Sequence, residues 1–133
     1  MPHVSIEYSP NLEDAAGIQG LCEALRHTAA GLDIFQMTGI RVRATRVDHY
    51  AIADGDPENG FIDISVRLRG GRPLAVRRAA AAALFDAAET HLADLLAARP
   101  VMLSLEMRDI DPELSPKRNT VRDHIARKKV RDE

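Results

Sequence analysis

Four segments of this chain alternate apolar and polar residues, and two longer segments repeat apolar residues at helical spacing. The alternating segments cover residues 4–8, 40–51, 61–69 and 101–108. Alternation predicts strands with one buried face, and a spacing of three and four predicts helices with one apolar side. The helical segments, 12–30 and 73–98, each lie between two predicted strands. The chain is therefore predicted to fold as β-α-β, a turn, β-α-β, and a tail.

This element order predicts an α+β fold with a four-stranded mixed sheet. Each β-α-β unit is expected to be a right-handed crossover between parallel strands. Since every strand is apolar on one face only, both helices are expected to cover the same face. A ferredoxin-like sandwich has the same element order, so the pattern leaves two folds open. The polar face is either exposed to water or shared with other subunits, and carries Arg41, Arg43, Asp63, Ser65, Arg67, Ser104 and Glu106.

Length and cysteine content limit the class of protein. The 133 residues fit a single domain, 1–133, with a polar and basic tail over residues 109–133. The single cysteine, Cys22, cannot form an internal disulfide, which favours the cytoplasm. The first residues show no signal peptide, and no apolar run is long enough to span a membrane.

Charge and motif content exclude further classes. The formal net charge is −2, which argues against a nucleic-acid binder. The tail from residue 117 is basic but has no aromatic residue for base stacking, so it is expected to be solvated or to pack on a neighbouring subunit. Zinc, P-loop and dinucleotide motifs are absent, and the five histidines are scattered. No metal and no cofactor are expected.

Pro2 is the most unusual candidate for chemistry. A small residue after Met1 generally permits removal of the methionine, which would leave Pro2 with a free secondary amine. Burial and neighbouring cations disfavour an ammonium, so the pKa of this amine is expected to fall toward neutrality. Such an amine can act first as a general base and then as a general acid.

The predicted topology brings arginines to the same place. If strand one is parallel to strand two and antiparallel to strand three, then Pro2, Arg41 and residues 69–72 share one end of the sheet. Arg72 also precedes the second helix, whose free N–H groups favour anions. Two guanidiniums suit carboxylates, which arginine binds bidentately. Arg69 adds a further cation close to this pocket.

Several segments of the chain resemble the 5-carboxymethyl-2-hydroxymuconate isomerases, a family of the tautomerase superfamily. The resemblance covers nearly the whole chain, and the segments that carry it are Pro2-His3, Gly39-Ile40-Arg41-Val42-Arg43, Ala53-Asp54-Gly55, Gly71-Arg72 and Lys117-Arg118-Asn119-Thr120-Val121. It implies two β-α-β units and a homotrimer.

The resemblance also implies a reaction and roles for residues. Pro2 would be the catalytic acid and base, and Arg41 and Arg72 would bind and polarise a di- or tricarboxylate substrate. The reaction would be the tautomerisation of a 2-hydroxymuconate-type dienol to its 2-oxo isomer in the meta-cleavage degradation of homoprotocatechuate (4-hydroxyphenylacetate). His3 either lines the pocket or is structural. Phe61 is the candidate for an aromatic wall of the pocket, although the alternation of residues along its strand places it on the polar face.

Two alternatives remain open at this point. One is a tautomerase-fold enzyme that acts on a different enol acid. The other is a non-catalytic module on a ferredoxin-like sandwich that binds a small molecule. The first alternative differs only in substrate, whereas the second is expected to be a dimer or a monomer and to tolerate extra residues before Pro2.

Overall fold

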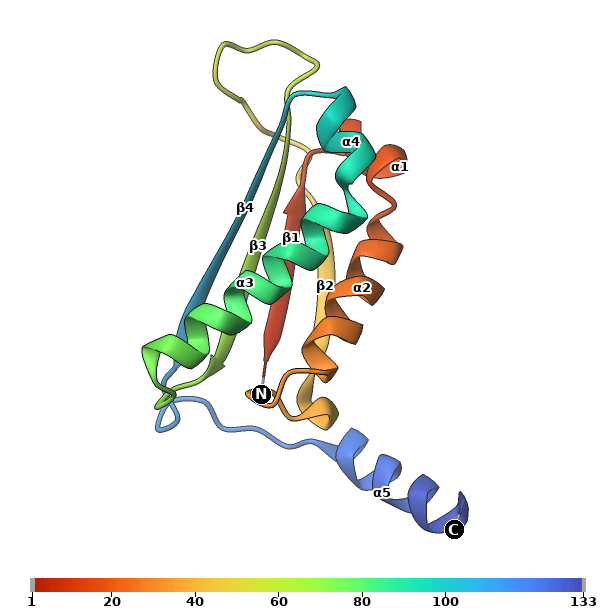
Figure 1. Ribbon diagram of the computed structural model, residues 1–133, viewed down its shortest axis with the longest axis vertical. Helices are drawn as coiled ribbons and strands as arrows, with labels where there is room; N and C mark the ends of the chain where they lie inside the picture. Colours follow the sequence, from red (N-terminus) through yellow and green to blue (C-terminus); the bar gives the residue numbers. More distant parts are fainter. Residues whose placement is uncertain (1, 133) are drawn as a thin grey trace.

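The sheet confirms the predicted α+β architecture. The computed structural model describes residues 2–132, with side chains through residue 130. Its strands are β1 (His3–Tyr8), β2 (Arg41–Arg46), β3 (Gly60–Arg69) and β4 (Val101–Ile110). They form a sheet of order β2-β1-β3-β4 (Figure 1). β1 is parallel to β2, β3 is parallel to β4, and β1 is antiparallel to β3.

The strand order decides between the two folds that the sequence left open. In a ferredoxin-like sandwich another strand separates the two strands of each β-α-β unit. Here the strands of each unit are direct neighbours, β1 beside β2 and β3 beside β4. The chain therefore has the tautomerase-like arrangement of two β-α-β units.

Both main helices cover the same face of the sheet, as the alternation predicts (Figure 1). The helical elements are the short 3-10 helices η1 (Pro10–Leu12) and η2 (Met37–Gly39), and α1 (Glu13–Ala16), α2 (Ile18–Ala30), α3 (Leu74–His91), α4 (Ala93–Ala98) and α5 (Thr120–Asp132). The core joins alternate strand residues to the apolar sides of α2 and α3, and includes Val4, Ile6, Ile62, Ile64, Val66, Leu68, Leu21, Leu25, Leu84 and Ala88. Small alanines on α3 let this helix lie close to its neighbours.

The prediction of two uninterrupted helices is wrong in both places. The first is broken at Gly17, whose φ of +57° is left-handed, and His91 Nε2 lies 2.9 Å from the Ala16 carbonyl oxygen at this break. The second is broken at Leu92. Because Leu92 at the break and Leu95 after it are both buried, the apolar spacing continues through the break and gives no sign of it.

Strand lengths and the tail also differ from the prediction. β2 ends at Arg46 because its partner β1 ends at Tyr8, the residue paired with it. β4 continues to Ile110 because β3 continues beside it to Arg69. The polar tail contains the helix α5, which projects away from the sheet (Figure 1). No helix in the described part of the chain has the length and apolar character needed to cross a membrane.

Candidate active site

The start of β1 brings the predicted residues together. His3 pairs with Arg41 on β2 and with Arg67 on β3. Pro2, one residue earlier, is fully buried, and its carbonyl oxygen accepts a hydrogen bond from the Arg41 backbone N–H at 3.4 Å. The expected removal of Met1 concerns a residue outside the described part. The shared sheet end that the sequence predicts is confirmed.

Arg41 is held in place by its own surroundings. Its Nη1 donates to the Gly39 carbonyl oxygen at 3.2 Å, which ties the guanidinium to η2. Its Nε lies 3.2 Å from His3 Nδ1 and its Nη2 lies 2.6 Å from His3 Nε2. The imidazole therefore packs against the guanidinium, and a neutral His3 can accept a hydrogen bond from it. His3 thus has a positioning contact with Arg41.

The charge around His3 is strongly positive. Burial and the guanidiniums of Arg41, Arg67 and Arg43 lower the pKa of His3 from 6.5 to about 4. The imidazole is consequently neutral at neutral pH. These guanidiniums also disfavour a further positive charge on any group close to them, including the nitrogen of the adjacent Pro2.

The lowered pKa of His3 makes the stability of the protein depend on pH. Between pH 6.5 and about 4 the unfolded state binds a proton that the folded state does not, so stability falls as the pH falls through this range. His3→Gln is expected to flatten this part of the dependence, measured as the free energy of unfolding in urea at several pH values. His49→Gln, at an exposed site, is the matched control. An NMR titration that gives His3 an ordinary midpoint would contradict the prediction.

Arg72 lies in the turn between β3 and α3, at the same end of the sheet. Gly71 has a φ of +105°, a conformation that suits glycine and turns the chain sharply before Arg72. The Arg72 guanidinium donates to the Arg69 carbonyl oxygen at 2.9 Å and to the Ile34 carbonyl oxygen at 3.1 Å. These bonds use two of its five N–H donors, so three remain for a ligand.

A segment from the tail crosses the same end of the sheet. Residues 111–119, which we term the strap, follow β4 at one sheet edge, and the Asn119 side-chain amide donates to the Thr38 carbonyl oxygen at 2.8 Å near the other edge. The strap must therefore pass the ends of β3 and β1 (Figure 1). The packing of the tail on a neighbouring subunit stays a prediction.

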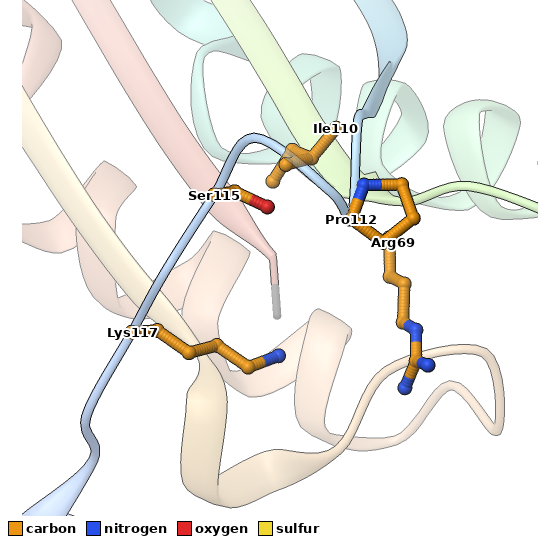
Figure 2. A pocket seen from close by; sticks show the side chains of 5 residues that line it. All are labelled: Arg69, Ile110, Pro112, Ser115 and Lys117. Atoms are coloured by element: carbon orange, nitrogen blue, oxygen red, sulfur yellow. The ribbon is translucent and has the colours of Figure 1, made fainter.

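The strap closes one side of a cavity of about 240 Å³ (Figure 2). The cavity is lined by Arg69, Ile110, Pro112, Ser115 and Lys117. Sequence reasoning did not select Lys117 as a site residue. The available signal was weak: the three lysines of the chain all lie at or after residue 117, and Lys117 is the first of them.

Phe61 does not lie at this site. It is the second residue of β3, beyond the Tyr8 end of β1, whereas the arginines lie at the His3 end. Its ring contacts Tyr50 edge to face, with centroids 6.1 Å apart. Within one chain the prediction of Phe61 as an aromatic wall beside Pro2 is therefore wrong. Alternation along a strand predicts on which face of the sheet a side chain lies, but not how far it is from the site.

Comparisons with known proteins show which family the chain belongs to. The family model of 5-carboxymethyl-2-hydroxymuconate isomerase matches residues 2–125. A 5-carboxymethyl-2-hydroxymuconate Delta-isomerase from Escherichia coli is 35% identical over 121 residues, which is 91% of this chain and 96% of that protein.

Solved structures show the same relationship. The crystal structure of a 5-carboxymethyl-2-hydroxymuconate isomerase from Deinococcus radiodurans R1 matches with a TM-score of 0.85 and 32% identity, over 93% of each chain. A symmetric trimer of fused 4-OT has the same fold, with a TM-score of 0.65 and 20% identity over 88% of this chain and 92% of that one. The chain thus belongs to the 5-carboxymethyl-2-hydroxymuconate isomerase family, and it is a tautomerase-fold isomerase.

Proposed function

We propose that the protein converts 5-carboxymethyl-2-hydroxymuconate to its 2-oxo isomer in homoprotocatechuate (4-hydroxyphenylacetate) degradation. The observation that carries this proposal is that buried Pro2, Arg41 and the turn with Arg72 that follows β3 lie at the same end of the sheet. A tautomerisation needs one group that moves a proton and cations that hold the charge formed in between. This sheet end offers both, beside an uncharged His3.

The reaction proceeds by two proton transfers through the Pro2 amine, with Met1 removed. The amine takes the proton of the 2-hydroxyl group, and the oxygen electron pair becomes a carbonyl as negative charge spreads along the diene. The resulting ammonium then gives its proton to the far end of the conjugated system, so that no net proton is gained or lost. Arg41 and Arg72 bind the carboxylates and stabilise the dienolate between the two steps.

The proposed assembly is a homotrimer. Its support within the chain is the uncovered face of the sheet, where Arg67, Ser104 and Met102 lie without a covering helix. Met102 is 56% exposed, although it lies in a strand. A shared sheet face would bury such residues between subunits, and sedimentation equilibrium measures the resulting mass directly.

A spectrophotometric substrate panel tests the proposed function. Purified protein is mixed with 5-carboxymethyl-2-hydroxymuconate, 2-hydroxymuconate and phenylenolpyruvate, and the loss of each enol is followed by absorbance. The proposal expects the highest kcat/KM with the first compound. A clear preference for phenylenolpyruvate would instead support a tautomerase for another enol acid, and no turnover of any of the three would reject the isomerase function.

A further inference from the structure

The proposed substrate carries three carboxylates, whereas the two arginines assigned to it account for two. A muconate is a dicarboxylate, and the carboxymethyl group adds a third anion at the side of the diene. One guanidinium binds one carboxylate bidentately, so Arg41 and Arg72 leave this anion without a partner. The site therefore needs another cation if the third carboxylate is to be recognised.

We propose that Lys117 binds the carboxymethyl carboxylate and so determines the preference of the enzyme for a tricarboxylate substrate. This inference rests on the proposed function. The cavity under the strap combines the two properties that a carboxymethyl group requires. Ile110 and Pro112 give it an apolar wall for the methylene, and Lys117 and Arg69 give it positive charge (Figure 2).

The position of the strap places this cavity beside the proposed site. Arg69, in the cavity wall, accepts a hydrogen bond at its carbonyl oxygen from Arg72. At the other end the strap is bound to Thr38, next to Gly39, which fixes the Arg41 side chain. Lys117 lies between these two anchors, and it also lines a second cavity with Thr38 and Gly39. It thus lies along the path between the two arginines.

The Lys117 ammonium is available for a ligand. Among the residues whose side chains the structure describes, neither Lys117 nor Arg69 forms an ion pair. Figure 2 shows the Lys117 side chain extending from the strap in the direction of the cavity wall that carries Arg69. Ser115, by contrast, donates its hydroxyl proton to the Asp111 carbonyl oxygen at 2.6 Å, which stabilises the bend of the strap.

The test compares substrates that differ only in the third carboxylate. Lys117→Met removes the charge and keeps an unbranched side chain that is one atom shorter. We expect this variant to lose about 10- to 100-fold in kcat/KM for 5-carboxymethyl-2-hydroxymuconate, mainly through KM, as fits the loss of one charged hydrogen bond. With 2-hydroxymuconate, the kcat/KM of the variant should remain within about twofold of the wild-type value, because this substrate has no third carboxylate for Lys117 to bind.

Two further variants separate binding from a structural effect. Lys117→Arg keeps the positive charge and should restore most of the selectivity. Lys128→Met removes a lysine from an exposed position on α5 and should change neither substrate's kinetics. An equal loss with both substrates, or no loss with either, would overturn the assignment of Lys117.

A binding measurement keeps this test independent of turnover. Calorimetry compares propane-1,2,3-tricarboxylate with glutarate, which lacks the middle carboxylate, on wild type and Lys117→Met. A weaker affinity of the variant for the tricarboxylate alone supports the role of Lys117. Identical affinities of both proteins for both ligands would overturn it. If the wild type isomerises no dienol, the proposed function fails, while the calorimetric comparison still decides whether Lys117 recognises a third carboxylate.

Discussion

Blocking the Pro2 nitrogen is expected to reduce kcat/KM for the dienol by about 100- to 10,000-fold, the range that positioned acid–base catalysis supplies. A leucine inserted between Met1 and Pro2 provides this block, because a bulky second residue prevents removal of Met1 and leaves the proline nitrogen in an amide. An amide nitrogen can neither accept the hydroxyl proton nor return it. Intact-mass measurement must show that the methionine is retained, and thermal unfolding must show that the fold persists.

Pro2→Ala is the matched comparison for that insertion. After removal of Met1 it leaves a primary amine at the same place, so it is expected to keep more activity than the blocked protein. Full activity in a preparation whose mass includes both Met1 and the inserted leucine would rule out Pro2 as the catalytic base. Equal activities of the two variants would show that the free amine has no special role.

Replacing Arg72 by alanine is expected to lower kcat by about 100- to 1,000-fold, as loss of one donor to a developing negative charge does in other enzymes. The reason is that the dienolate charge forms only between the two proton transfers, so its stabilisation appears in kcat. Arg72→Lys retains a charge but not the planar fork, and a smaller loss is expected. Steady-state kinetics on the preferred substrate measure both effects.

The fold makes a control for Arg72 necessary. Its hydrogen bonds to Arg69 and Ile34 tie two loops together, so its removal also weakens local structure. Arg78→Ala, one helical turn into α3 and exposed, should leave activity and unfolding temperature unchanged. If Arg72→Ala lowered the unfolding temperature but left kcat intact, its role would be structural rather than electrostatic.

The sequence predicts the sheet better than it predicts the helices. The alternation of apolar and polar residues in β3 directly predicts that Ile62, Ile64 and Val66 face the core, because strand geometry fixes the side on which each side chain lies. Helical spacing carries less information about continuity. The apolar face passes through Gly17 and Leu92 without interruption, so the breaks there depend on backbone conformation and on the contact of His91 with the first break.

In the candidate site, too, the sequence predicts the position of some residues and not of others. The sequence could predict that Pro2, Arg41 and Arg72 lie at one end of the sheet, because strand direction alone decides which residues share a sheet end. The place of Lys117 could not be predicted, since it depends on the bond between Asn119 and Thr38, which are 81 residues apart. Phe61 is misplaced within one chain because alternation predicts its face of the strand but not its distance along the strand from Pro2.

The strap has a consequence for the order of events during synthesis. Pro2 is fully buried in the finished fold, and residues 111–119, which cross its end of the sheet, leave the ribosome long after it because the whole sheet lies between them in the sequence. An aminopeptidase that exposes the Pro2 amine therefore has its best access while the chain is still growing. The proposed catalytic amine would then be released before the segment that crosses its end of the sheet has been made.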